Sequence, residues 1–150
     1  MTKRENHIDP AKINLLHIEE VKVNLSDSPS RGEVQITPDI AHISGYNLEE
    51  KKYFIGLQLK LTLLDDEEQE SELFFRYNFH FKVENLDKMY TRKEERILSF
   101  SRVFVSTLAG ISYSTLRGIV YEKTTGNFNT PIVLPVIDPS IILDSWIKNA

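Results

Sequence analysis

Two neighbouring segments carry a large apolar residue at every second position, and this pattern constrains the fold more than any other feature. The first is YFIGLQLKLTLL (53–64), in which every odd-numbered residue is large and apolar. The second runs from Leu73 to Val83 and places polar residues such as Arg76 and His80 between the apolar ones. Such alternation predicts two half-buried strands. The acidic run DDEEQESE (65–72) between them predicts an antiparallel hairpin with a charged, solvated tip or, as the alternative, a docking patch for a basic partner.

Two further strands are expected before this hairpin. The segment His17–Leu25 has alternating apolar residues and ends at the turn cluster SDSPSRG. The segment Glu33–Ser44 is interrupted by Pro38, which predicts an edge position, a bulge or a break there.

After a polar loop (Glu84–Arg96) the apolar spacing becomes helical, from Ile97 to about Lys123, with no proline. A helix of about 26 residues would be about 39 Å long. Its apolar residues form two rows, which is a wider surface than one sheet can cover. We therefore expect another subunit to cover the remainder. The rows are Ile97, Phe100, Phe104, Leu108 and Ile111, and Leu98, Val105, Ala109, Leu116 and Val120.

The chain then enters an extended apolar loop, TTGNFNTPIVLPVIDP, and a short helix over Ser140–Ala150 capped by Asp138 or Ser140. The expected fold is α+β: a four-stranded antiparallel sheet followed by a long helix and a short C-terminal helix. With no repeat or interdomain linker, residues 1–14 are expected to form a flexible arm and residues 15–150 a single domain.

Composition excludes several classes of protein. The net charge of −4 argues against nucleic-acid binding, and the absence of cysteine excludes disulfides and thiolate chemistry. No apolar run follows the charged N-terminus, and runs such as VFVSTLAGI are shorter than the ~20 residues that span a bilayer. We expect a cytoplasmic protein without a membrane span.

The segment GISYSTLRGIVYEKTTG (110–126) lacks the GKS or GKT of a phosphate-binding loop. Its glycines instead belong to a row of small residues at four-residue spacing, which predicts a stripe where another backbone approaches the helix. We interpret this stripe as oligomer packing by Ser106, Gly110, Ser114 and Gly118.

Catalytic and metal-binding patterns are not found in the sequence. The four histidines are scattered and have no zinc-ligand spacing, and the acidic run lacks the oxygen spacing and glycine of a calcium loop. No serine has a G-x-S-x-G context. We expect a protein that is not an enzyme and needs no metal or cofactor.

The apolar loop is the candidate site. One interpretation is a lid that closes the edge of the core. The other is one wall of a hydrophobic groove for extended apolar peptides. The residues assigned to peptide binding are Phe128, Pro131, Ile132, Val133 and Leu134.

The order of these elements resembles that of the export chaperone SecB and its relatives. YFIGLQLKLTL is similar to the family's Tyr-started alternating strand, and HIEEVKVNL to its first strand. GNFNTPIVLPVI resembles the family's Gly-x-Phe segment and its Pro-Val before the last helix, with Gly126, Phe128, Pro135 and Val136 at the matching positions.

This resemblance implies an ATP-independent holdase chaperone for unfolded polypeptide or preprotein clients, active in protein export. It implies a homo-oligomer, a dimer of dimers whose long helices pack between the dimers. It also places Glu20 at an acidic position used in partner docking, the partner being the export motor ATPase. Asn24, Arg76 and Lys82 depart from the family's acidic outer face, and the family's acidic tail is missing, so a stand-alone or antitoxin-associated chaperone fits equally well.

Two other classes of function stay open. One is a small-ligand-binding protein or hotdog-like enzyme, whose long helix would lie between strands rather than after all four. The other is a structural oligomerisation module that assembles through the small-residue stripe without binding unfolded chains.

Overall fold

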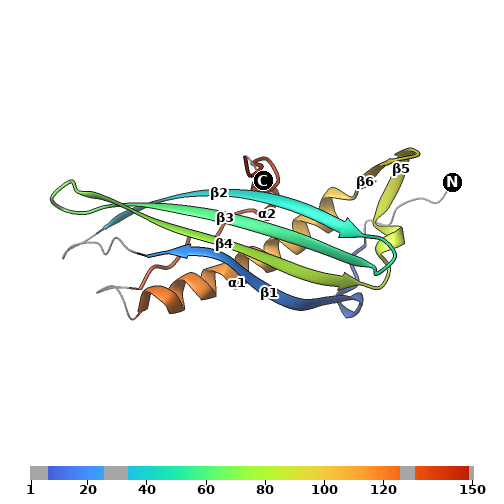
Figure 1. Ribbon diagram of the computed structural model, residues 1–150, viewed down its shortest axis with the longest axis horizontal. Coiled ribbons are helices and arrows are strands. Elements are labelled where there is room, and N and C mark those ends of the chain that lie inside the picture. Colours follow the sequence, from blue (N-terminus) through green and yellow to red (C-terminus); the bar gives the residue numbers. More distant parts are fainter. Residues whose placement is uncertain (1–6, 26–33, 126–130, 149–150) are drawn as a thin grey trace.

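The computed structural model describes residues 7–25, 34–125 and 131–148 of the chain. It contains a sheet of four long strands, a small two-stranded hairpin and one long helix (Figure 1). The elements are η1 (Pro10–Lys12), β1 (Ile13–Asn24), β2 (Gln35–Asn47), β3 (Lys52–Leu64), β4 (Glu70–Val83), η2 (Leu86–Lys88), β5 (Tyr90–Glu94), β6 (Ile97–Phe100), α1 (Arg102–Thr125) and α2 (Pro139–Ile142).

The main sheet has the strand order β1-β4-β3-β2, and all three pairings are antiparallel. This confirms the predicted α+β class and the hairpin of β3 and β4. Strand β2 is an edge strand with an unbroken register along β3, so Pro38 occupies an edge position and causes no bulge. A proline is tolerated there because its nitrogen points away from the sheet, where no neighbouring strand needs a hydrogen-bond donor.

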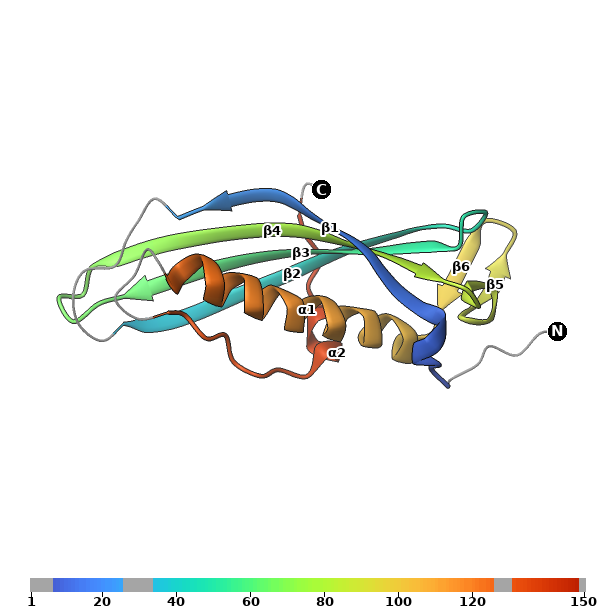
Figure 2. The same ribbon diagram turned by 90° about the horizontal axis from the view of Figure 1, so that it is seen from below.

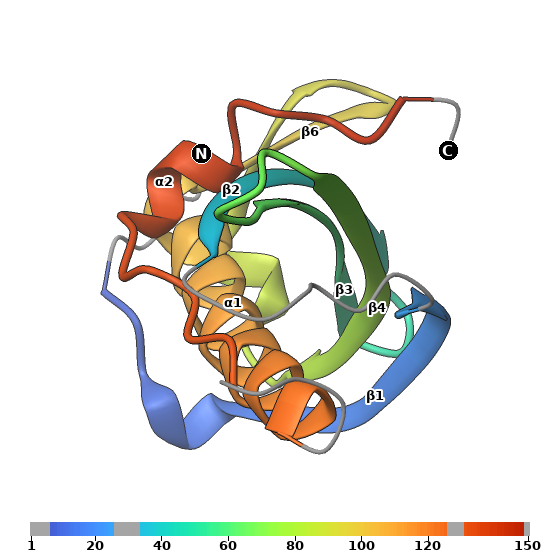
Figure 3. The same ribbon diagram turned by 90° about the vertical axis from the view of Figure 1, so that its left-hand side faces the viewer.

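The alternating residues of β3 and β4 form the core. The large apolar side chains at odd positions, from Tyr53 to Leu63 and from Leu73 to Val83, are buried on one face of the sheet. Helix α1 runs along that face, and the sheet curls around it (Figures 2 and 3). The even-numbered residues therefore line the opposite face, which we call the outer face of the sheet.

The predicted start of the long helix at Ile97 is wrong. Residues 90–94 and 97–100 form the β5–β6 hairpin, and α1 begins at Arg102. The Ser101 hydroxyl accepts a hydrogen bond from the Phe104 amide at 3.3 Å, as an N-cap residue does. Phe100 is held by ring contacts at centroid distances of 5.0 to 6.2 Å from Tyr46, Tyr53, Tyr90 and Phe104.

The C-terminal helix is shorter than predicted. Asp138 caps α2 as expected, because its carboxylate accepts a hydrogen bond from the Ser140 amide at 2.9 Å. The helix ends at Ile142, and the chain continues along the free edge of β2. There the His42 amide donates to the Ser145 carbonyl and the Ile147 amide donates to the His42 carbonyl, both at 2.8 Å.

Ordered structure at the N-terminus begins before residue 15. The predicted arm (1–14) includes η1 and the first two residues of β1, and the Glu84 amide donates to the Lys12 carbonyl at 3.0 Å. Ile8 and Ile13 pack against the core. Residues 1–6 of the arm lie outside the described residues.

Candidate functional site

Helix α1 has two different faces. Its inner face lies on the sheet and buries Phe104, Leu108, Leu116 and Val120. The outer face has no charged side chain between Arg102 and Arg117, although a helix face in contact with water is usually charged or polar. Val103, Ile111 and Tyr121 are exposed on α1.

Three hydrogen bonds hold the described part of the apolar loop, residues 131–138, against α1. The Ile132 amide donates to Thr124 Oγ1 at 2.9 Å, the Arg117 Nε donates to the Leu134 carbonyl at 3.0 Å, and the Tyr113 hydroxyl donates to the Pro135 carbonyl at 2.6 Å. Partial burial raises the pKa of Tyr113, which keeps its hydroxyl protonated as a donor. The helix thus positions the loop backbone through its own side chains.

The side chains of this loop alternate between the core and the surface. Ile132 and Leu134 are 5% and 1% exposed and belong to the core, whereas Val133 and Val136 are 64% and 82% exposed. Val133 and Val136 are therefore exposed on a backbone segment that hydrogen bonds hold against α1. Residues with this exposure are candidates for binding an apolar partner.

The turns at the start of α1 and the short helix α2 enclose a shallow hollow of about 440 Å³. It is lined by Arg102, Val103, Ser106, Thr107, Pro139 and Ser140. The Arg102 Nη2 donates to the Ser140 carbonyl at 3.0 Å and to Asp144 Oδ1 at 3.1 Å, which holds α2 beside α1. We use the term apolar surface for the exposed apolar residues of these elements, Val103, Ile111, Val133, Val136 and Ile141.

The residues predicted to bind peptide fall into different places. Val133 lies on the apolar surface, Pro131 is half-buried, and Ile132 and Leu134 point into the core. Phe128 lies outside the described residues. The sequence analysis did not assign Val103, Val136 and Ile141 to the site. Val136 departs from the alternation of Ile132, Val133 and Leu134, because a period of two would place it in the core beside Leu134.

The predicted small-residue stripe follows the outer side of α1. Ser114 and Gly118 are exposed, and a Cβ atom at Gly118 would meet no atom within 4 Å. Ser106 and Gly110 are half-buried, and a Cβ at Gly110 would lie 3.0 Å from Pro139 Cγ. One glycine thus accommodates α2 of the same chain, while the other half of the stripe is open.

Glu20, the predicted docking residue, makes contacts within the chain. Its Oε1 accepts a hydrogen bond from the Tyr77 hydroxyl at 2.7 Å and lies 3.1 Å from the Lys123 Nζ. The Tyr77 hydrogen bond is the largest cause that lowers the pKa of Glu20, followed by Lys123. These contacts join β1 to β4 and to the last turn of α1.

Strand β1 lies at the other edge of the sheet from β2 and pairs only with β4 among the described residues. It carries the exposed apolar residues Leu15, Leu16, Ile18 and Val21, and its register shifts twice, near Leu16 and near Val21. A strand edge of this kind can pair with another chain.

Helix α1 is long and apolar enough, by length and composition, to cross a bilayer, contrary to the sequence expectation. Its inner face is packed on the sheet, and the core helix of a soluble protein passes the same test. Within residues 7–25, 34–125 and 131–148, no group of three or more histidine and acidic side chains is arranged to hold a metal ion.

No protein-family model matches this sequence, and no curated protein is similar to it. Among solved structures, the chain is similar to the SecB-like chaperone Rv1957 of Mycobacterium tuberculosis in complex with a ChAD peptide from the Rv1956 HigA1 antitoxin. The TM-score is 0.59 at 11% identity, over 85% of this chain and 92% of that one. A protein of unknown function from Streptococcus agalactiae matches with a TM-score of 0.45 and 12% identity, over 83% and 97%. The chain therefore has a SecB-like α+β fold.

Proposed function

We propose that this protein is an ATP-independent holdase chaperone that binds unfolded or preprotein chains on its apolar surface. The observation that carries the proposal is the outer side of α1 and its loop, which presents apolar side chains above a core that is already closed. The similarity to a SecB-like chaperone supports it. Burial of client side chains at about 25 cal/mol per Å² would supply the affinity.

The peptide-binding segment is the loop that includes Phe128 and Pro131–Leu134. Within it, Val133 faces the client, and Ile132 and Leu134 hold the backbone from below, because their side chains fill the core. Val136 extends the contact toward α2. An unfolded chain that meets several such sites binds through many weak contacts.

We further propose that the protein assembles as a homo-oligomer, a dimer of dimers. The open half of the small-residue stripe on α1, at Ser114 and Gly118, and the apolar edge strand β1 are two surfaces that lie outside the apolar surface proposed for the client, and a dimer of dimers needs two. We place the protein in the cytoplasm, where newly made chains are still unfolded. Its partner beyond the client is an antitoxin or the export motor ATPase, and the antitoxin peptide bound by the similar chaperone supports the former.

The proposal is tested by light scattering of an unfolding client at a stoichiometric ratio without ATP. The protein should suppress aggregation, and Val133→Glu with Val136→Glu should abolish most of the suppression. The control is Ile97→Glu, which changes an apolar residue on β6 that is 51% exposed. A protein that oligomerises but leaves client aggregation unchanged would instead be a structural module.

A further inference from the structure

The outer face of the sheet carries two pairs of cations directly opposite each other. Lys22 on β1 is the register partner of Arg76 on β4, and Lys52 on β3 is the register partner of Lys82 on β4. Like charges at directly opposed positions destabilise a sheet. Two such pairs on one face therefore require an explanation other than stability.

The first pair lacks a counter-charge within the described chain. Arg76 lies between Lys22 and Gln58 on the neighbouring strands, and its Nε is buried without a hydrogen-bond partner. The Oδ1 of Asn78, on the same face of β4, is buried and unpartnered as well. Lys22 rests over the ring of Phe74, with its Nζ 5.5 Å from the ring centroid, so its charge stays beside Arg76.

On the outer face of β1, the acidic group nearest to this pair is already engaged. Glu19 Oε1 accepts a hydrogen bond from Asn78 Nδ2 at 3.1 Å and lies 3.1 Å from His80 Nε2. Those contacts lower the pKa of Glu19, the hydrogen bond with His80 being the largest cause.

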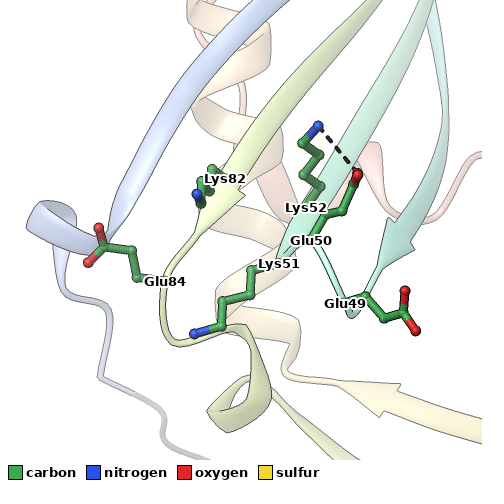
Figure 4. Close-up of a pocket in the computed structure, with 6 residues that line it drawn as sticks. All are labelled: Glu49, Glu50, Lys51, Lys52, Lys82 and Glu84. Carbon is green, nitrogen blue, oxygen red and sulfur yellow. Dashed lines mark ion pairs between the residues drawn. The ribbon is translucent and has the colours of Figure 1, made fainter.

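The second pair lies at the end of the sheet, at a hollow of about 710 Å³. Figure 4 shows Lys52 and Lys82 side by side on neighbouring strands, with Glu49 and Glu84 pointing away from them. Lys52 lies 3.3 Å from Glu50, whereas Lys82 makes no ion pair with any described residue. A second, smaller hollow of about 190 Å³, lined by Gly45, Phe54 and His80 among others, lies beside Lys52.

We propose that this face docks an extended acidic segment of a partner protein. The segment would run along β4, with one carboxylate at Lys22 and Arg76 and another at Lys52 and Lys82. Arg76 and Lys82 are six residues apart on one strand, or about 20 Å, so the acidic residues of an extended ligand would also be six apart. An apolar side chain between them would enter the smaller hollow. The surface is separate from the apolar surface on α1, so it does not depend on the proposed chaperone activity.

The experiment measures fluorescence anisotropy of a labelled Gly/Ser peptide that has glutamate pairs six residues apart and one phenylalanine between them. We expect saturable binding that weakens as salt rises. Arg76→Gln and Lys82→Gln should each weaken it about tenfold, the cost of losing one charge-assisted hydrogen bond. Lys93→Gln is the matched control, because it removes the same charge from an exposed position of β5, and it should bind as the original protein does.

Three results would overturn the proposal: no binding, an equal loss in Lys93→Gln, or equal binding of a peptide with adjacent glutamates. Tighter binding of inorganic polyphosphate that also depends on Arg76 would assign the face to polyanions instead of acidic peptides. Lys82 is exposed, so its variant keeps the test decisive even if Arg76→Gln unfolds the protein.

Discussion

At the residue scale, Glu20 joins three elements through two contacts, with Tyr77 on β4 and Lys123 on α1. Its pKa is lowered in the folded chain from the ordinary value of 4.5. A carboxyl of this kind stabilises the fold above its unfolded pKa, and the contribution is lost as pH falls through the lower folded value. The stabilisation by Glu20 is therefore present at neutral pH and disappears in acid.

Glu20→Gln should lower the free energy of unfolding near pH 7 and leave it close to that of the original protein near pH 3. Denaturant titrations at a series of pH values measure this difference. Glu49→Gln is the control, because this exposed residue makes no ion pair with any residue in the described part of the chain. If Glu20→Gln lowers the free energy of unfolding equally at both pH values, the charge of Glu20 does not stabilise the fold.

A second prediction at the residue scale concerns Tyr113. Its hydroxyl donates one of the three hydrogen bonds that position the apolar loop. Tyr113→Phe removes the donor to the Pro135 carbonyl and should cost about 1 kcal/mol of stability. The denaturation midpoint should fall with an unchanged slope. Tyr121→Phe changes a half-exposed tyrosine of the same helix and should have little effect.

At the scale of elements, a substitution at Gly118 can change the association of subunits without disturbing the fold of α1. Nothing lies within 4 Å of a Cβ placed there, whereas Gly110 is close to Pro139. Gly118→Leu should therefore stabilise the isolated helix by up to about 1 kcal/mol and still weaken association by blocking close approach. Gly110→Leu would also disturb the contact with α2, so it should change both the fold and the assembly.

Analytical ultracentrifugation of Gly118→Leu measures the association, and thermal unfolding measures the fold. We expect a smaller assembly with an equal or higher unfolding temperature of the subunit. An unchanged assembly would place the subunit contact elsewhere on the molecule.

The four strands of the sheet could be predicted because their alternation is a local signal. In β3 and β4 each buried residue is flanked by half-buried or polar ones, from Tyr53 to Val83, with few exceptions. The hairpin β5–β6 was missed because Ile97 and Phe100 also fit helical spacing, and a four-residue strand is too short for its period to be distinguished. Ser101 was the available signal, since it precedes the helix as a cap.

The candidate site was predictable only in part. The apolar composition of the loop indicated a surface, but which side chains face outward depends on two hydrogen bonds with α1: the Ile132 amide donates to Thr124 Oγ1, and Arg117 Nε donates to the Leu134 carbonyl. Ile132 and Leu134 consequently lie in the core, and Val136 is the most exposed large apolar residue in the described part of the chain. The pair of Lys22 and Arg76 depends on strand order, because β1 pairs with β4 and two strands lie between them in the sequence.

At the scale of the whole molecule, the two proposed subunit contacts can be separated by mutation. Val21 is an exposed apolar residue on the edge strand β1, and Gly118 lies on α1. Val21→Lys should weaken pairing at the sheet edge, because a lysine opposes strand addition. Size-exclusion chromatography with light scattering should then give dimers from either single variant and monomers from the double variant.

The single variant Lys22→Gln, which keeps Val21, is the control for a change of charge on the same strand. If Val21→Lys and Gly118→Leu both leave a tetramer, neither surface is the subunit contact. If the original protein is a monomer at every concentration, the proposed dimer of dimers is wrong.

The segment that follows α2 limits how many sheets can join edge to edge. Pro38 is four residues from His42 in an unbroken register, so its nitrogen also faces away from β3 and offers no hydrogen. His42 is already bonded to residues 145 and 147. With β2 obstructed at these two positions, we expect sheets to join through β1 rather than through β2, so the pairing of sheets stops at two. Removal of residues 143–150 would expose the His42 backbone and leave Pro38 as the remaining obstruction on β2, and the product should include assemblies larger than the original particle.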